Sequence, residues 1–253
     1  MSINNRLINA GGGAPQPEGT GSLLWGSSNG FYISVDDGLT WTQDGIVGLP
    51  NNNNFVTRST DWNGTVFCTS VGGTNESFIY TSPDGYNWTQ TATIARQDDS
   101  GMAVDPVTRA FIYAAGIYAS GYGIFESLDN GVTWTPKGSG GAYYTFSKVA
   151  QRNGYGVASG RTGNWLRTAQ ANNYGNQTTY TYYNSSVYYQ NNSWVANRYG
   201  GYDGVARTTG TSPGRFLTWP QVQSAANYVH GAYNIFGNGV SEMVTTWYTG
   251  QNS

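Results

Sequence analysis

The sequence predicts an all-β fold built from repeated antiparallel sheets, and three observations lead to that prediction. Aromatic residues make up 15% of the 253 residues, glycine contributes 36 and charged residues only 10%, a composition that favours strands joined by many tight turns. No stretch keeps the 3.6-residue apolar period of a helix. A short motif recurs, so that Trp41, Trp88 and Trp134 lie 47 and then 46 residues apart. A period of this length is typical of a repeated supersecondary unit.

The repeated unit is clearest in its second copy, where alternating runs are separated by turn residues. We expect its strands at residues 55–60, 65–70, 78–81 and 88–91. Four strands that follow one another up and down in this way form the blade of a β-propeller. The sequence therefore predicts a β-propeller of four-stranded antiparallel blades.

The third unit keeps the same plan, and the fourth and fifth units keep it while the motif becomes weaker. The third unit predicts strands at 102–105, 110–115, 123–126 and from Trp134 onward. The fourth and fifth units are indicated by runs at 164–168, 204–208 and 216–219. Between them, Tyr182, Tyr183, Tyr188 and Tyr189 flank Asn184-Ser185-Ser186, which fits either a hairpin turning at those three residues or the alternation of a core strand.

The two ends of the chain predict how the ring closes. The first unit begins with runs at 23–25 and 31–33 and lacks an opening strand, whereas two further runs, at 228–235 and 240–248, follow the fifth unit. If these C-terminal strands join the N-terminal blade, no sheet edge is left exposed and the ring has five blades. The alternative is a ring of six blades, in which the two ends belong to separate sheets.

The recurring octapeptides carry a family resemblance. Residues 34–41, 81–88 and 127–134 resemble the Asp-box of sialidases and other bacterial-neuraminidase-repeat proteins, whose pattern is Ser/Thr-x-Asp-x-Gly-x-Thr-Trp. The first and third copies match every defined position. The second departs from the pattern, with Pro83 in the Asp position, Asp84 one residue later and Asn87 for Thr.

The resemblance implies a structural role for the box, in a turn between the third and fourth strands of a blade. Physical chemistry supports that role, because the carboxylate accepts turn amide protons, the glycine takes a positive φ and the tryptophan covers the hairpin. The residues assigned to it are Asp36, Gly38, Trp41, Asp84, Gly85, Trp88, Asp129, Gly131 and Trp134.

The sequence lacks the features that would make the resemblance enzymatic. Sialidases are similar to one another in a Phe/Tyr-Arg-Ile-Pro motif, and no Arg-Ile-Pro occurs here. Asp98-Asp99 with Asp105 could form a calcium or acid/base cluster, but we favour a solvated turn. We therefore expect no catalytic residues, and keep a sialidase-like glycosidase as an alternative.

Charge and cysteine content exclude several other classes. The net charge of −2 and the absence of a basic run argue against a nucleic-acid partner. No apolar run approaches the roughly 20 residues of a membrane span, so we expect no membrane insertion. Cys68 and His230 are the only residues of their types, which leaves no disulfide within the chain and no conventional zinc site. We expect no metal and no cofactor, and read Cys68 as a buried strand residue.

The expected binding residues lie on the face opposite the boxes. Loops between second and third strands fall at 26–30, 72–77, 116–123, 160–164 and 198–204, and further loops join consecutive blades. Mixtures of Tyr, Ser, Gly and Asn with Arg are typical of adaptable recognition surfaces and of sugar sites. The predicted ligand-binding residues are Tyr118, Tyr122, Arg161, Arg198, Tyr199, Tyr202, Asp203 and, between blades, Arg96.

The ends and the polar surface suggest a context. Residues 1–20 read as a flexible Gly/Pro-rich leader or anchoring arm, and 21–253 as the propeller. The leader lacks the apolar stretch of a signal peptide, and together with the polar propeller it resembles bacteriophage appendage proteins. We expect a non-catalytic virion protein of the tail or head fibre type, made in the host cytoplasm and released by lysis.

Two partners follow from this interpretation. The opposite face would bind a host-surface glycan or receptor, and residues 1–20 would dock on other virion proteins. A purely structural virion component that docks on other subunits is the alternative from another class.

Overall fold

A computed structural model gives the fold over most of the predicted propeller. It describes residues 23–27, 30–36, 39–50, 56–72, 75–95, 98–117, 123–137, 144–160, 163–167, 175–176, 183–190, 193–199, 205–209, 217–218, 230–237 and 243–248. Within these residues all regular structure is β-strand, in agreement with the predicted fold class. Among them there is no helix long and apolar enough to cross a membrane.

The described strands follow one another in up-and-down order. They are β1 (Leu23–Ser27), β2 (Gly30–Ser34), β3 (Val56–Trp62), β4 (Phe67–Gly72), β5 (Glu76–Ser82), β6 (Thr89–Ala95), β7 (Asp98–Val104), β8 (Phe111–Ile117), β9 (Ile124–Ser127), β10 (Thr135–Pro136), β11 (Tyr144–Arg152), β12 (Tyr155–Gly160), β13 (Gly163–Arg167), β14 (Gly175–Asn176), β15 (Tyr183–Gln190), β16 (Ser193–Tyr199), β17 (Val205–Thr209), β18 (Leu217–Thr218), β19 (His230–Gly237) and β20 (Met243–Tyr248).

Consecutive strands pair antiparallel in groups of four. The β3–β6 and β15–β18 groups are separate four-stranded sheets. The β7–β10 and β11–β14 groups are joined into one eight-stranded sheet, because Tyr144 and Thr145 of β11 pair with the end of β8. The predicted four-strand unit is thus confirmed in register as well as in number.

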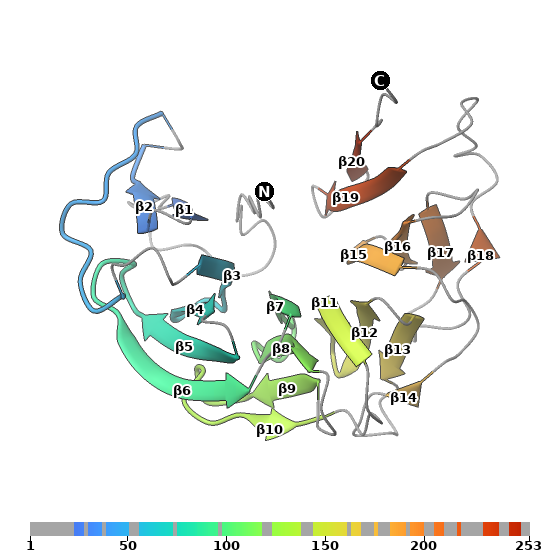
Figure 1. The fold of residues 1–253 in the computed structure, drawn as a ribbon, viewed down its shortest axis with the longest axis horizontal. Coiled ribbons are helices and arrows are strands. Elements are labelled where there is room, and N and C mark those ends of the chain that lie inside the picture. The colour runs from blue at the N-terminus through green and yellow to red at the C-terminus, as the bar shows by residue number, and fades with distance from the viewer. Residues whose placement is uncertain are drawn as a thin grey trace.

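The groups are arranged in an arc, with the first strand of each on the inside (Figure 1). Along this inner side β3 contacts β7, β7 contacts β11, β11 contacts β15 and β15 contacts β19. The sheets therefore succeed one another side by side, as the repeat period predicts.

The two ends of the arc do not pair with each other in the described residues. β1 and β2 form one two-stranded sheet, extended at Ile33 by a bridge to Thr42, and β19 and β20 form another. In the residues that the structure describes, the predicted joining of C-terminal strands to the N-terminal blade is not seen, and the five-bladed and six-bladed rings both stay predictions.

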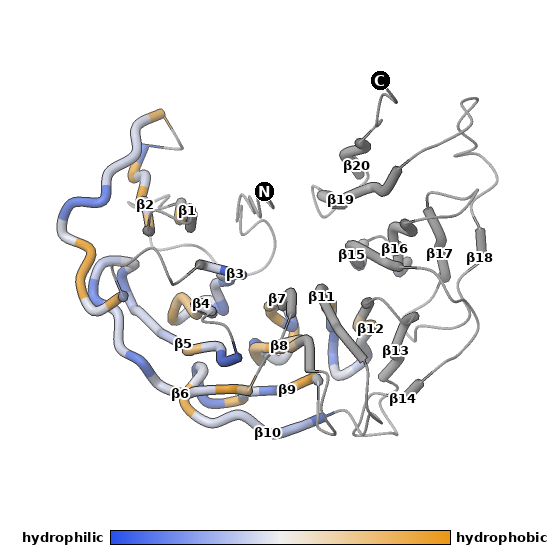
Figure 2. Tube along the Cα trace, viewed as in Figure 1, coloured by the Kyte–Doolittle hydropathy of each residue, from blue (hydrophilic) through white to orange (hydrophobic). Residues whose placement is uncertain are grey.

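The hydrophobic core lies between neighbouring sheets. One cluster joins Cys68 and Ile79 of the β3–β6 sheet to Phe111 and Tyr113 of β8. Another packs Leu24 and other residues of the first sheet against the β3–β6 sheet. Figure 2 shows hydrophobic residues also on the connection that follows β2. Cys68 is buried on β4, as expected, and is a free thiol whose pKa is raised well above its usual value by burial and by the charge of Asp61.

The tyrosine-rich stretch before Trp194 is a single strand. β15 runs through Asn184 to Ser186 with a register shift at that point, so the hairpin that would turn there is wrong. Tyr189 of this strand packs against Trp194, with ring centroids 4.6 Å apart and the rings tilted by 59°, which fits the alternative of core alternation.

Candidate functional site

The first box folds around one carboxylate. Asp36 accepts hydrogen bonds from the Ser34 hydroxyl (2.7 Å) and from the backbone N–H (2.8 Å) and hydroxyl (2.5 Å) of Thr40. These donors tie the end of β2 to the start of the next segment, which is why the motif needs a hydroxyl residue on each side of the aspartate. The third box repeats the contacts, with Ser127 (2.8 Å) and the N–H (2.8 Å) and hydroxyl (2.6 Å) of Thr133 donating to Asp129.

The second box uses the same device in a shorter turn. Ser82 donates to Asp84 at 2.9 Å, and Asn87 donates through its backbone N–H and its side-chain amide, both at 2.8 Å. Asp84 therefore fills the role of Asp36, with Ser82 as the partner serine. The sequence alignment that put Pro83 in the Asp position is wrong. The second box instead lacks one residue between its aspartate and its glycine.

The box carboxylates are held ionised by these hydrogen bonds. The pKa of Asp36 is lowered to about 2, mainly by the hydroxyl and the N–H of Thr40. For Asp84, burial acts to raise the pKa, but the hydrogen bonds from Asn87 outweigh it and lower the pKa to about 2. The pKa of Asp129 is likewise lowered, first by the Thr133 hydroxyl. A carboxylate held in this way is a poor proton donor near neutral pH, so none of the three suits general acid catalysis.

The second and third boxes also fasten one sheet to the sheet before it. A Cβ on Gly85 (φ +81°) would lie 3.2 Å from Ile33 of β2, and one on Gly131 (φ +83°) would lie 2.9 Å from Thr81 of β5. The hydroxyl of Thr91, on β6, donates to the Gly131 carbonyl at 2.7 Å. Only glycine allows this close approach, so the boxes serve packing between sheets.

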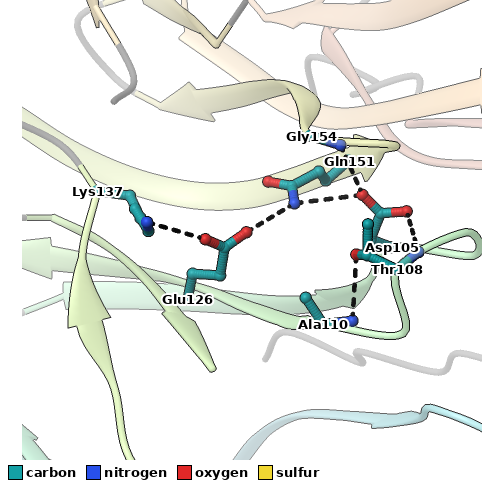
Figure 3. Close-up of polar contacts among 7 residues, drawn as sticks. All are labelled: Asp105, Thr108, Ala110, Glu126, Lys137, Gln151 and Gly154. Atoms are coloured by element: carbon teal, nitrogen blue, oxygen red, sulfur yellow. Dashed lines mark hydrogen bonds and ion pairs between the residues drawn. The ribbon is translucent and has the colours of Figure 1, made fainter. Parts of the chain in front are cut away.

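A second polar cluster joins the β7–β10 group to β11 (Figure 3). Gln151 donates through Nε2 to Glu126 Oε1 at 2.9 Å and to Asp105 Oδ2 at 3.3 Å. Lys137 Nζ lies 3.2 Å from the other oxygen of Glu126. Asp105, Glu126 and Gln151 are buried, and Lys137 is largely so.

The turn after β7 and the turn after β11 meet at Asp105. Its carboxylate accepts the N–H groups of Val107 (2.9 Å), Thr108 (3.2 Å), Asn153 (2.9 Å) and Gly154 (3.0 Å). Burial acts to raise the pKa of Asp105, but these four backbone hydrogen bonds outweigh it, and the pKa lies below the usual value. Two buried carboxylates bridged by an amide could suggest an acid/base pair. Here the oxygens are occupied by internal donors, which favours a structural role.

The cluster of Asp98, Asp99 and Asp105, which we considered less favourable than a solvated turn, does not form. Asp98 and Asp99 begin β7, whereas Asp105 follows its last residue, about 20 Å away at roughly 3.3 Å per strand residue. Asp105 stands beside a turn whose residues 106–108 are exposed, but Asp105 itself is buried, so the expectation of solvation is wrong for its carboxylate. In the part of the chain that the structure describes, no group of three or more His, Cys, Asp or Glu could hold a metal ion.

Because consecutive strands are antiparallel, successive connections lie at opposite ends of each sheet. The boxes and the turns after β3, β7 and β11 lie at one end, which we call the box end. The connections β4–β5, β8–β9, β12–β13 and β16–β17 leave from the other, which we call the loop end. Strand order thus places the strand ends that flank the predicted binding loops opposite the boxes.

Two of the predicted ligand-binding residues lie at one of these loop-end strand ends. Arg198 and Tyr199 are the last residues of β16, where their backbones pair with Asn184 and Tyr183 of β15. The others lie outside the described residues, as does Gly38 of the first box: Arg96, Tyr118, Tyr122, Arg161, Tyr202 and Asp203.

Sequence reasoning missed the links between turns at the box end. Asp61 accepts the Val104 N–H at 3.1 Å, and Asn63 donates to the side chain of Asn130 at 2.8 Å. The available signal was a polar residue at the end of each inner strand, since Asp61, Asp105 and Gln151 all stand next to a turn. Sequence could not show that their partners come from a neighbouring group of strands.

Comparison with known proteins supports the fold. No family model and no curated protein matches the chain. Among solved structures, it is similar to an ancestral GH74 enzyme, with a TM-score of 0.61 and 15% identity over 90% of this chain and 33% of that one. It is also similar to the Cps50 (Swd1) β-propeller domain of Myceliophteria thermophila, with a TM-score of 0.63 and 10% identity over 90% and 76%.

A third similar structure is the nidogen/laminin complex, with a TM-score of 0.57 and 10% identity over 89% of this chain and 85% of the matched chain. The chain spans about a third of the length of the GH74 enzyme it matches. At these identities the likeness concerns architecture alone. Together with the four-stranded antiparallel groups, it shows that the chain has a β-propeller fold.

Proposed function

We propose that this propeller is a non-catalytic binding protein of a virion appendage, of the bacteriophage tail or head fibre type, that holds a host-surface glycan with its loop end. The observation that carries the proposal is the division of the sheets into two ends. At the box end the carboxylates are engaged in turns and in packing between sheets, which leaves the loop end for a ligand.

The residues assigned to the loop end have the chemistry of a sugar site. Arg198 and Tyr199 end β16, and Tyr202 and Asp203 follow in the connection to β17. A tyrosine ring covers the apolar face of a pyranose, while arginine and aspartate bond its hydroxyl groups. Such rings also lose little side-chain entropy on binding, which suits a recognition surface.

The ring of this protein would close at the first box. The second and third boxes pack against the sheet that precedes each of them, whereas Trp41 of the first box is 37% exposed. A five-bladed ring in which the C-terminal strands join the N-terminal blade would bring a sheet against Trp41. The Asp-box geometry supports membership of the bacterial-neuraminidase-repeat propellers.

A glycan array tests the function. We expect the full chain to bind at least one glycan, and Arg198→Ala and Tyr202→Ala each to weaken that binding about tenfold or more. Arg152→Ala is the matched control, because Arg152 is exposed beside the box-end turn after β11, with its guanidinium 5.3 Å from the Tyr189 ring centroid.

Two results would overturn the proposal. One is a failure of the glycan array, either because no glycan is bound or because Arg152→Ala weakens binding as much as Arg198→Ala does. The other is hydrolysis of a fluorogenic glycoside that is abolished by replacing a single aspartate, which would make the protein a glycosidase.

A further inference from the structure

The box end carries exposed apolar side chains. Among the residues whose side-chain exposure the structure describes, large exposed hydrophobic residues lie in the boxes or in turns or segments beside them: Val35, Leu39, Trp41, Val47, Val107, Leu128 and Val132. Single exposed leucines are ordinary on protein surfaces. Here the same two positions are apolar and exposed in the first and third boxes, as Val35 and Leu128 at one and Leu39 and Val132 at the other, and this repetition calls for an explanation.

The apolar residues occupy the positions that the box motif leaves free. The position after the box serine holds Val35, Pro83 or Leu128, and the position before the Thr or Asn holds Leu39, Tyr86 or Val132. The side chains of these residues take no part in the hydrogen bonds that build the corner, which come from the serine, the Thr or Asn and the backbone. Leu39 is 85% and Leu128 77% exposed. Folding of the corner therefore does not require them to be apolar.

Contacts between corners place them on one side of the molecule. Asn63, in the turn after β3, donates both to Asn130 of the third box (2.8 Å) and to the carbonyl of Arg109 in the turn after β7 (3.4 Å). The segment after the first box pairs with the second, since the Trp88 N–H donates to the Val47 carbonyl at 3.0 Å. A partner that lies across the box end can therefore touch the corners of neighbouring sheets together.

The charge of the corners indicates the chemistry of that partner. Asp84 and Asp129 are exposed, Asp36 is half-buried, and all three are ionised beside the apolar residues. Of the described cations at the box end, Lys137 is held by Glu126 at 3.2 Å, Arg109 is half-buried, and Arg152 is exposed with its guanidinium 5.3 Å from the Tyr189 ring centroid. A second copy docked face to face would bring like carboxylates together, which is unfavourable. A surface with lysine or arginine among apolar side chains would match both features.

We propose that the box end is a protein-docking surface, and that its partner presents lysine or arginine side chains among apolar ones. Leu39, Leu128 and Val132 supply the apolar contacts, and the three box carboxylates meet the partner's cations. The identification of that partner as another subunit of the virion rests on the proposed function. The docking chemistry does not.

Immobilised peptides of defined chemistry test the surface. One probe is an amphipathic helix with a leucine stripe and a lysine stripe, and the other has glutamate in place of lysine. We expect the full chain to bind the lysine–leucine helix and not the glutamate–leucine helix. The double variant Leu39→Ser/Leu128→Ser should weaken binding about tenfold or more while all box carboxylates remain. Because both leucines are exposed, the variant should melt as the parent does.

The control variant is Asn75→Ser, because Asn75 is exposed at the loop end, just before β5. It should bind the lysine–leucine helix as the parent does. Equal binding to both helices, or an unchanged affinity in the double variant, would overturn the proposal. So would self-association in ultracentrifugation that the double variant abolishes, since a second copy would then be the occupant.

The same variants separate this inference from the proposed function. Leu39→Ser/Leu128→Ser should leave glycan binding unchanged, because it alters only the box end. If no glycan is bound but the lysine–leucine helix is still recognised through the two leucines, the proposed function fails and the docking surface stands. If glycan binding depends on Arg198 and the helices are not distinguished, the reverse holds.

Discussion

The first box and the later two share a carboxylate geometry but differ in packing. In all three a serine hydroxyl donates to the aspartate at 2.7–2.9 Å. Trp88 of the second box, however, is only 4% exposed and donates its indole N–H to the Gly85 carbonyl at 2.8 Å, whereas Trp41 of the first is 37% exposed. The difference follows the neighbours: Gly85 contacts the first sheet, while the first box precedes every other sheet in the chain.

This contrast separates a local device from a tertiary one. The aspartate needs partners only two to four residues away, so it forms whether or not another sheet is present. Burial of the tryptophan depends on the sheets around it. The box is therefore a turn motif that becomes a packing motif when a neighbouring sheet covers it.

The largest loss of stability should come from replacing a box tryptophan with alanine. Trp88→Ala removes a buried ring that packs with Phe31 and Phe67, and we expect it to lower the free energy of unfolding by about 3–5 kcal/mol. Trp41→Ala should lower it by about 1 kcal/mol, because much of the ring already contacts water. Urea denaturation followed by circular dichroism measures both.

The outcome for Trp41 also tests ring closure. If Trp41→Ala proves as destabilising as Trp88→Ala, a sheet must cover the first box in solution. That result would remove the contrast between the boxes and would favour the five-bladed ring closed by the C-terminal strands.

The second largest loss of stability should come from crowding the contact between a box glycine and the preceding sheet. Gly131→Ala places a methyl group 2.9 Å from Thr81 Cγ2 and 3.2 Å from Cys68 Sγ, at a φ of +83°. Backbone strain of about 1 kcal/mol and overpacking of about 2 kcal/mol should add, so we expect a loss of about 3 kcal/mol. Gly154→Ala has nearly the same φ, +78°, and nothing within 4 Å, so it should show the strain alone. Equal losses for the two variants would show that the box does not press on the preceding sheet.

The strand plan was predictable because it is local. Runs expected at 55–60 and 78–81 appear as β3 (Val56–Trp62) and β5 (Glu76–Ser82), since alternation and turn residues act over a few positions. The alignment of the second box failed for a physical reason: a turn shortened by one residue still places Ser82 and Asp84 for the same hydrogen bond. Pattern matching at fixed length could not detect that.

The candidate sites depend on residues that are far apart in the sequence, so less of their structure could be predicted from local patterns. Strand order assigns Arg198 and Tyr199 to the loop end, but no local pattern specifies what they bind. Asp105 stood out in the sequence as a turn residue, yet two of its hydrogen-bond donors, Asn153 and Gly154, are 48 and 49 residues away. Only the stacking of one sheet on the next brings these groups together.

The third effect compares a buried carboxylate with the exposed ones in the boxes. Asp105→Asn replaces an acceptor oxygen with an amide that cannot accept from the turn N–H groups, and we expect a loss of about 2 kcal/mol at neutral pH. The pKa of Asp105 is lowered in the folded state, so its contribution is present above the unfolded value of about 3.9 and is lost as pH falls through the folded pKa.

A pH series of urea denaturations measures this linkage. The parent should lose stability on acidification more steeply than Asp105→Asn, and the two curves should converge at low pH. Parallel curves across the whole range would show that Asp105 does not carry its charge into the folded core.

The smallest effect concerns Asp36 itself, and it decides whether the first box is complete without a neighbour. Its pKa of about 2 rests first on the Thr40 hydroxyl, so Thr40→Val should raise that pKa toward the usual value with little change in the melting temperature. Carboxyl-detected NMR titration measures the shift, and Thr133→Val should raise the pKa of Asp129 in the same direction. Leu39→Ala, beside Thr40 but outside the hydrogen bonds, should leave the pKa of Asp36 in place. If Leu39→Ala shifted it as Thr40→Val does, the carboxylate would depend on cover by another surface, and the first box would not be the self-sufficient turn that its short-range contacts indicate.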